Sequence, residues 1–207
     1  MTRVALIGGG RWAGVHRDAL LQLGNEPAAV LVSSESSAER IRSEWQVPAV
    51  TSGKEADSQP SDAVIISSPN YLHAPHALGA LAAGRHVLVE KPMALNAEDC
   101  LAIIAAGSSA GKVVAVGHEM RVFTLFSEVK RLVEGGAIGA PVNLKLDLWR
   151  RPYRAGAGGW KADPAKIGSS ILEEPIHYLD LARWYLGPVA QVQAWANSRQ
   201  GHEELWQ

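Results

Sequence analysis

The chain has 207 residues, 47% hydrophobic and 20% charged, a balance typical of a globular protein and not of a disordered, collagen-like or coiled-coil chain. Its 20 Lys and Arg residues against 21 Asp and Glu give a formal net charge of -1, so no basic excess predicts a nucleic-acid partner. With one cysteine, a leading apolar run too short for a signal peptide and no stretch long enough to span a bilayer, we expect a cytoplasmic protein without a membrane partner.

The first part of the chain alternates short apolar runs with helical patterns. The apolar runs predict buried strands at residues 4–7, 28–32, 47–50, 62–66, 86–89 and 113–116. Apolar residues at helical spacing predict helices at residues 12–23, 36–45, 74–83 and 96–106. Strands that alternate with helices at this interval form βαβ units with right-handed crossovers. We therefore predict an α/β fold with a doubly wound parallel sheet, a Rossmann domain, over residues 1–118.

The pattern changes after Gly117. Helices are predicted at residues 122–133 and 176–186, a strand with one wet face at residues 142–149, and a further strand at residues 189–196. A ribbon of two strands is marginal unless something else covers it. We therefore expect residues 119–207 to form an incomplete α+β domain with a largely antiparallel sheet.

A glycine motif follows the first strand directly. Gly8, Gly10 and Ala13 match G-x-G-x-x-G/A between a strand and a helix. Gly8 permits the tight turn, Gly10 lets a pyrophosphate approach the backbone, and Ala13 lets the helix pack closely on the sheet. The amides of the first helical turn, which holds Arg11 and Trp12, then face the anion. The motif predicts a dinucleotide site, and the alternative is a flexible turn between strand and helix.

The end of the second strand bears on the choice between NAD and NADP. An NAD site usually has an acidic residue there for the ribose, whereas this chain has Ser33 and Ser34. Two hydroxyls can donate to a 2'-phosphate without repelling it, and Arg40 could add positive charge. Glu35 is the counter-argument, because a shift of one residue would restore the acidic partner. The sequence leans towards NADP, and NAD stays open.

A lysine stands at the end of the fifth strand. Lys91 follows Glu90 and precedes Pro92, which restricts the turn. The carboxyl ends of parallel strands are where doubly wound sheets place their ligands. There, an ammonium group can hydrogen-bond a substrate oxygen and offset charge as an alcohol becomes a carbonyl. The alternative is a solvated Lys91 paired with Glu90.

Glu173 and His177 form the second candidate catalytic group. Their i,i+4 spacing can align them on one helix face if the helix begins near Glu173. A carboxylate beside an imidazole raises its basicity and holds its orientation, as a general base requires. The alternatives are a capping carboxylate with a half-buried histidine, and a metal pair. We predict no metal site, because no third ligand has convincing spacing.

Several motifs can be compared as a set. They are the glycine motif followed by His16, residues 62–73 (DAVIISSPNYLH), residues 84–92 (GRHVLVEKP), and Glu173 and His177 followed by Asp180. Together they resemble the Gfo/Idh/MocA oxidoreductases, relatives of glucose-fructose oxidoreductase and inositol dehydrogenase. The match extends over nearly the whole chain, and the Glu-Lys-Pro element after this strand is far more specific than the glycines.

The resemblance implies a Rossmann domain, then an α/β domain whose open sheet often forms the interface of a homo-oligomer. It implies hydride exchange between NAD(P) and a sugar, cyclitol or related polyol. Lys91 then orients the substrate hydroxyl, and His177 serves as acid/base. Trp160 and Lys161 resemble an element near the active site. The matching residues that would line the cofactor are Pro69, Asn70, His73, Glu90, Lys91 and Arg121.

Three features depart from the family pattern. Glu173 stands where the family commonly has Asp, and Ser33 where it usually has an acidic residue. The chain is also shorter than family members commonly are. Two hypotheses follow: a hydride-transfer enzyme, or a truncated or non-catalytic dinucleotide-binding module. The first predicts turnover of a polyol or sugar, and the second predicts cofactor binding alone.

Overall fold

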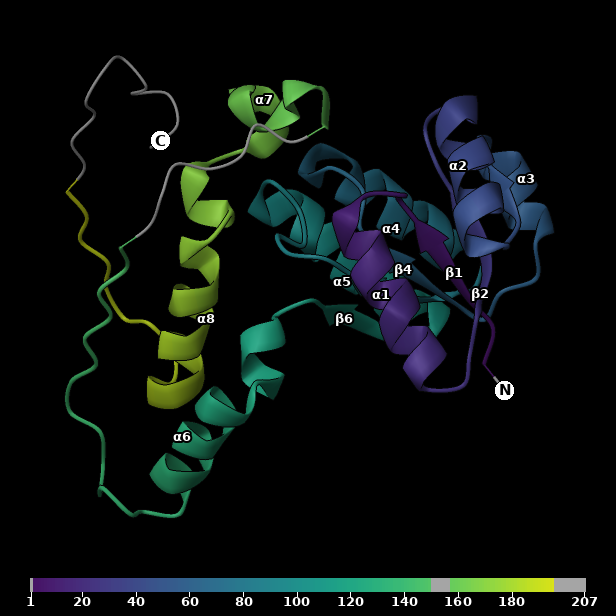
Figure 1. The fold of residues 1–207 in the computed structure, drawn as a ribbon. Coiled ribbons are helices and arrows are strands. Elements are labelled where there is room, and N and C mark those ends of the chain that lie inside the picture. Colours follow the sequence, from purple (N-terminus) through teal and green to yellow (C-terminus); the bar gives the residue numbers. More distant parts are fainter. Residues whose placement is uncertain (1, 150–156, 196–207) are drawn as a thin grey trace. The chain divides into compact units, whose positions relative to one another are not determined.

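A computed structural model of the chain describes residues 2–149 and 157–195 (Figure 1). The chain divides into two compact units, Met1–Gly117 and His118–Gln207. No helix in the described ranges is both long and apolar enough to cross a bilayer.

The first unit is built on a six-stranded sheet in which every strand pair is parallel. The strands are β1 (Val4–Ile7), β2 (Pro27–Leu31), β3 (Ala49–Val50), β4 (Ala63–Ile66), β5 (His86–Val89) and β6 (Val114–Val116). Their order is β3-β2-β1-β4-β5-β6, so the direction of winding reverses between β1 and β4. In sheets of this kind, ligands bind at that switch point, beyond the carboxyl ends of the strands.

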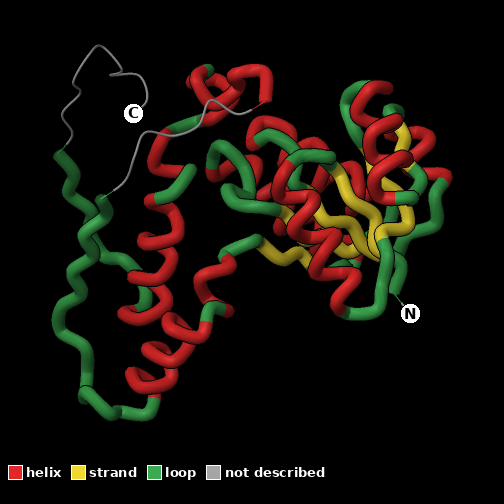
Figure 2. Tube along the Cα trace, in the orientation of Figure 1, coloured by secondary structure: helices red, strands yellow, loops and turns green. Residues whose placement is uncertain are grey.

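Helices cover both faces of this sheet, and Figure 2 shows the strands between them. They are α1 (Arg11–Gln22), α2 (Glu35–Trp45), α3 (Gly53–Ser58), the 3-10 turn η1 (Asn70–Leu72), α4 (His73–Ala82) and α5 (Ala97–Ala110). Successive residues of β1 point to opposite faces, and each enters a separate apolar cluster. Ile7 packs with Leu81 and Ile103 beneath α4 and α5, whereas Leu6 packs with residues of α1 and α2. The predicted parallel α/β fold is confirmed.

The second unit is mainly helical in its described residues. Its elements are η2 (Glu119–Val122), α6 (Thr124–Glu134), η3 (Ala157–Ala162), α7 (Pro164–Ile167), η4 (Ser170–Leu172) and α8 (Pro175–Leu186). Helices α6 and α8 are joined by two bonds to backbone carbonyls. The Tyr185 hydroxyl donates to the Phe126 carbonyl over 3.0 Å, and Lys130 Nζ donates to the Trp184 carbonyl over 2.6 Å. These bonds fix the helix that carries His177.

The two strands predicted for this unit differ from the structure. Residues 142–149 and 189–195 carry no strand, and residue 196 lies outside the described residues. Val142 is 96% exposed, Trp149 94% and Val192 79%. Alternating polarity marks which side of a strand could be buried, but the strand forms only where a neighbour supplies the ladder. The predicted antiparallel sheet is therefore absent from the described part of this unit.

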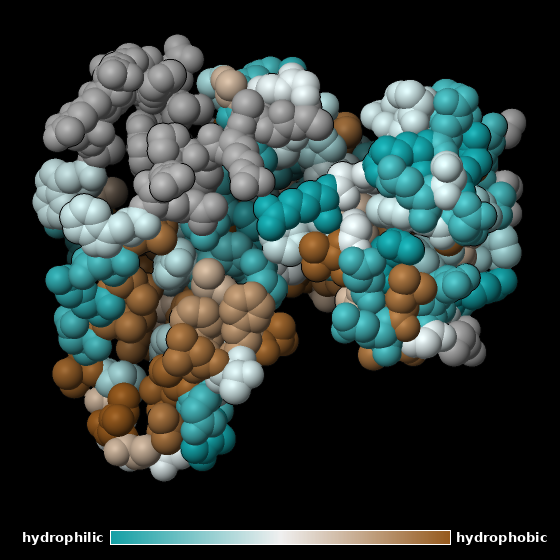
Figure 3. Space-filling view, viewed as in Figure 1, coloured by the Kyte–Doolittle hydropathy of each residue, from teal (hydrophilic) through white to brown (hydrophobic). Residues whose placement is uncertain are grey.

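Exposed apolar side chains are correspondingly numerous here. Figure 3 shows hydrophobic residues gathered on the surface of this unit, in the region that holds α6 and α8 in Figure 1. Leu125 on α6 is 68% exposed, and Val122, Ile138 and Trp195 are also exposed. An apolar surface of this extent is typical of a face that another element or chain covers.

Candidate active site

In the glycine turn at the end of β1, a side chain would clash at Gly8 but would find empty space at Gly10. Gly8 has a φ of +112°, and a Cβ there would lie 2.8 Å from the carbonyl carbon and oxygen of Ser67. Gly10 is the N-cap of α1, where no side chain caps the helix, and a Cβ at Gly10 would meet nothing within 4 Å. Buried Ala13 packs the helix on the sheet. The space beside Gly10, at the start of α1, is thus open, as the close approach of a pyrophosphate to this turn requires.

The segment after β2 brings an arginine, but not Glu35, to the glycine turn. Arg40 Nη2 donates to the Gly9 carbonyl over 2.6 Å, so a guanidinium lies against the glycine turn. Glu35, by contrast, forms an ion pair with Arg42 on the same helix. Ser34 Oγ caps α2 by accepting from the Ser37 amide over 3.3 Å, whereas Ser33 is exposed. The Arg40 guanidinium, which also pairs with Glu44 through Nη1, thus lies at the glycine turn, while the Glu35 carboxylate is held by Arg42.

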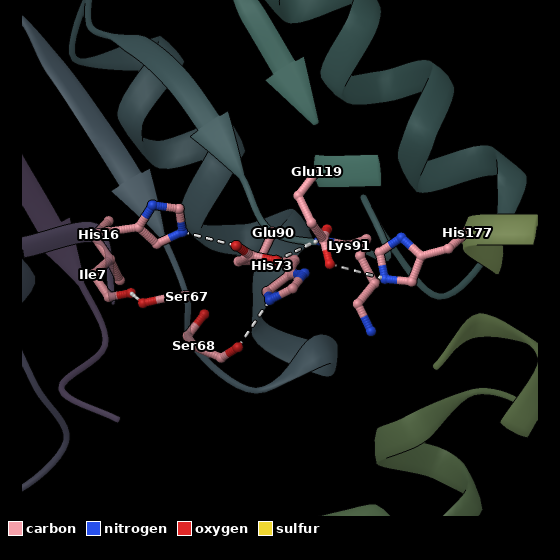
Figure 4. Close-up of polar contacts among 9 residues, drawn as sticks. All are labelled: Ile7, His16, Ser67, Ser68, His73, Glu90, Lys91, Glu119 and His177. Carbon is pink, nitrogen blue, oxygen red and sulfur yellow. Dashed lines mark hydrogen bonds and ion pairs between the residues drawn. The ribbon is translucent and has the colours of Figure 1, made fainter. Parts of the chain in front are cut away.

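The ends of β4 and β5 are tied together by a buried histidine (Figure 4). His73 Nε2 lies 2.8 Å from the Ser68 carbonyl oxygen, and its Nδ1 lies 2.6 Å from the Pro92 carbonyl oxygen. The ring thereby links the loop of Pro69 and Asn70 to the Glu-Lys-Pro turn. This assigns His73 a bracing role in the crevice, because both ring nitrogens already lie against backbone carbonyls.

Glu90 joins three segments of the same crevice. Its Oε1 lies 2.7 Å from His16 Nε2 of α1, and its Oε2 accepts from the Lys91 amide over 3.3 Å. A Cβ at Gly117, after β6, would lie 3.1 Å from Oε2, so the carboxylate also fills the space beside that glycine. Figure 4 shows the His16 contact. The carboxylate thus holds the turn from which Lys91 projects.

In the second unit, the carboxylates near the start of α8 are paired differently from the expectation. His177 is 3% exposed, and its Nε2 lies 3.4 Å from Glu119 Oε1 on η2 (Figure 4). Glu173 forms an ion pair with Lys161 of η3. Glu173 precedes α8, which starts at Pro175, so the helical i,i+4 geometry does not extend to it. Glu119 was not singled out from the sequence; its only signal is a carboxylate just beyond β6.

A second ion pair lies beside this contact. Arg121 of η2 donates to both carboxylate oxygens of Asp180 on α8, over 2.7 and 2.6 Å. The hydrogen bonds to Asp180 raise the pKa of Arg121 above its ordinary value, so the guanidinium stays charged. His118 Nδ1 lies 3.8 Å from Asp180 Oδ2. Arg121, predicted to line the cofactor, therefore braces η2 against α8 in this unit.

The structure thus gathers the candidates into one group in each unit. The first holds the glycine turn, the segment after β2, the loop of Pro69 and Asn70, and the Glu90–Lys91 turn, all beyond the carboxyl ends of parallel strands. The second holds Glu173, His177 and Arg121 around the start of α8. Within the described residues, no three His, Cys, Asp or Glu side chains are arranged to hold a metal ion.

Comparisons with known proteins match both parts of the chain. Residues 2–118 match the model of an oxidoreductase family with an NAD-binding Rossmann fold, and residues 126–205 match a GFO/IDH/MocA C-terminal domain. The chain is 33% identical over 141 residues to a 1,5-anhydro-D-fructose reductase of Ensifer adhaerens, covering 66% of this chain and 41% of that protein. It is 36% identical over 128 residues to an inositol 2-dehydrogenase of Saccharopolyspora erythraea, covering 60% of this chain and 35% of that one.

A solved structure of similar fold is the WlbA dehydrogenase from Bordetella pertussis, in complex with NADH and UDP-GlcNAcA. It superimposes with a TM-score of 0.80 at 27% identity, covering 90% of this chain and 56% of that one. The chain thus spans about half the length of that protein, and less than half of each of the two relatives above.

Proposed function

Since the chain belongs to the Gfo/Idh/MocA oxidoreductase family, we propose that it transfers a hydride between NAD(P) and a hydroxyl-bearing or ketone carbon of a sugar, cyclitol or related polyol. One observation carries the proposal. The uncapped glycine turn of α1 and Lys91 lie beyond the carboxyl ends of strands in the same parallel sheet. If the turn holds the dinucleotide, the nicotinamide would lie at the edge of the sheet from which the Lys91 ammonium group projects.

We assign cofactor binding to the first unit, with the domain ending at residue 118. The amides of Arg11, Trp12 and Ala13 would hold the pyrophosphate, and Pro69 and Asn70 would line the crevice. The Arg40 guanidinium donates to the Gly9 carbonyl through Nη2 and pairs with Glu44 through Nη1. Its place at the glycine turn favours the 2'-phosphate of NADP, and the carboxylate that could repel this phosphate, on Glu35, is paired with Arg42. When bound, the nicotinamide accepts or donates the hydride.

The protein's own groups would handle the oxygen and its proton. Lys91 donates a hydrogen bond to the reacting oxygen and offsets the charge that develops on it. His177 removes the hydroxyl proton in the oxidative direction and returns it to the oxygen in the reductive direction. Glu173, paired with Lys161 of η3, ties that turn to the segment just before α8, the helix that carries His177.

Residues 119–207 are proposed to belong to a substrate and oligomerisation domain. The alternating polarity and high exposure of residues 142–149 fit a strand that pairs within an antiparallel sheet once its other strands are present. We propose that such a sheet forms the interface of a homo-oligomer. The single cysteine fits a reducing compartment, and we place the protein in the cytoplasm.

The test is a cofactor titration followed by a substrate panel. The 207-residue chain is titrated with NADPH and with NADH by fluorescence, then assayed with each oxidised cofactor against sugars and cyclitols. We expect saturable binding and reduction of the cofactor by at least one polyol. Binding without turnover of any panel member supports the alternative, a non-catalytic dinucleotide-binding module. Absence of binding would exclude both.

The cofactor preference depends on Arg40. In the Arg40→Ala variant, we expect the Kd for NADPH to rise about tenfold and that for NADH to change less than about twofold, because only NADPH carries the 2'-phosphate. The control is Arg3→Ala, at an exposed arginine just before β1, on the amino-terminal edge of the sheet, where its guanidinium pairs with Asp62. The control should not weaken NADPH binding. Equal losses for both cofactors in Arg40→Ala would refute the assignment.

A further inference from the structure

The buried position of His177 raises the question of how its proton reaches solvent. The side chain is 3% exposed, whereas a general base must exchange its proton with water in every catalytic cycle. A carboxylate within ion-pair distance belongs to Glu119, whose Oε1 lies 3.4 Å from His177 Nε2 and whose side chain is 30% exposed. Glu119 thus reaches both the buried ring and the solvent.

Two other carboxylates near α8, those of Glu173 and Asp180, are engaged by cations. Glu173 is paired with Lys161, and both oxygens of Asp180 accept from Arg121. Both have less exposed side chains than Glu119. Of these three carboxylates, Glu119 combines contact with the ring and access to water.

The bidentate ion pair between Arg121 and Asp180 helps to hold Glu119 in contact with His177. Arg121 lies on the same 3-10 turn as Glu119, and Asp180 lies one helical turn after His177 on α8. Two charge-assisted hydrogen bonds between these neighbours therefore hold η2 and α8 in register. The His118 ring, 6.3 Å from the His177 ring and perpendicular to it, packs on the same side of α8.

We infer that Glu119 is a positioning residue that carries the proton of His177 to solvent. The inference rests on the proposed function. The Nε2–H bond of the imidazolium breaks as an O–H bond forms on Glu119, and the carboxylic acid then releases the proton to water and regains its charge. No electron is transferred in either step. The 3.4 Å separation has to shorten by a few tenths of an ångström, as such contacts commonly do when substrate binds.

Several charged and titratable groups lie on the elements around His177, and the variants must separate the effect of Glu119 from theirs. These groups are His118 just before η2, Glu119 and Arg121 on η2, Glu128, Lys130, Arg131 and Glu134 on α6, Lys161 on η3, Glu173 and Glu174 before α8, and Tyr178, Asp180, Arg183 and Tyr185 on α8. Replacement of Glu119 with Gln retains the shape of the side chain but removes its ability to accept a proton. Glu119→Asp retains the carboxylate. Glu128→Gln, at an exposed carboxylate paired with Arg131, is the control.

The first measurement does not depend on turnover. In the full chain labelled with 15N-histidine, the exchange of the His177 ring N–H with water is followed by NMR and assigned with His177→Gln. We expect exchange at least about tenfold slower in Glu119→Gln and within about threefold of the native rate in Glu119→Asp and Glu128→Gln. Native exchange in Glu119→Gln would overturn the inference. Thermal unfolding of each variant shows whether the fold is retained.

The second measurement uses turnover of a substrate found in the panel. We expect Glu119→Gln to lose about ten- to a hundredfold in kcat in dilute buffer and to recover as the acetate concentration rises, since a small carboxylate can replace the missing relay. The native enzyme should not respond to acetate. A loss without buffer dependence, with native ring exchange, means a purely structural role and overturns the inference. If no polyol is turned over, the proposed function fails while the ring exchange still decides the relay.

Discussion

Replacing Gly8 with alanine is expected to destabilise the first unit by about 2–4 kcal/mol and to abolish NADPH binding. Two effects add at this position. A φ of +112° is strained for any residue with a Cβ, and the added Cβ would lie 2.8 Å from backbone atoms of Ser67 that cannot rotate away. Because Ser67 follows β4, the end of β1 must move relative to β4, and the turn that holds the pyrophosphate moves with it.

Alanine substitutions at two further glycines distinguish the cost of backbone strain from the loss of contact with the ligand. At Gly24, φ is +69° and a Cβ meets nothing, so Gly24→Ala should cost about 1 kcal/mol with unchanged binding. At Gly10, φ is -84° and the space is open, so Gly10→Ala should retain the fold and weaken NADPH binding at least about tenfold. Urea unfolding and fluorescence titration measure both quantities. Full NADPH affinity in Gly10→Ala would contradict the placement of the pyrophosphate.

The first unit could be predicted from sequence because its signals are local. The strands inside the sheet, such as β1 and β4, are buried on both faces and are therefore short apolar runs. The glycine motif likewise depends on its immediate neighbours along the chain. The short helix α3 was missed, because Gly53–Ser58 is polar and has no helical periodicity. Its existence depends on the connection between β3 and β4.

The second unit shows where local patterns stop being sufficient. Residues 142–149 alternate as a strand does, yet a strand requires a partner that this segment does not encode. The pairing of Glu173 with Lys161 and the approach of Glu119 to His177 both join residues from different elements. The i,i+4 rule could indicate neither, because it applies only within one helix and Glu173 precedes Pro175.

Replacing Lys91 with alanine is expected to lower kcat/KM about a thousandfold while the Kd for NADPH changes less than about threefold. The ammonium offsets charge that exists on the substrate oxygen only as the reaction proceeds, so its loss affects turnover more than cofactor binding. Lys112→Ala is the matched control. Lys112 lies just before β6, at the amino-terminal edge of the parallel sheet, and its loss should leave kcat/KM unchanged.

The roles of Lys91 and His177 can be tested jointly. Both are proposed to act on the same substrate oxygen, so the loss in Lys91→Ala/His177→Gln should exceed the larger single loss by less than about tenfold. Groups that act as a unit give such non-additive losses, whereas independent sites give the product of the two. Steady-state kinetics of the two single variants and the double variant measure the coupling. A fully multiplicative loss would show that the two side chains serve separate steps, and turnover within about threefold of native in either single variant would remove that residue from the mechanism.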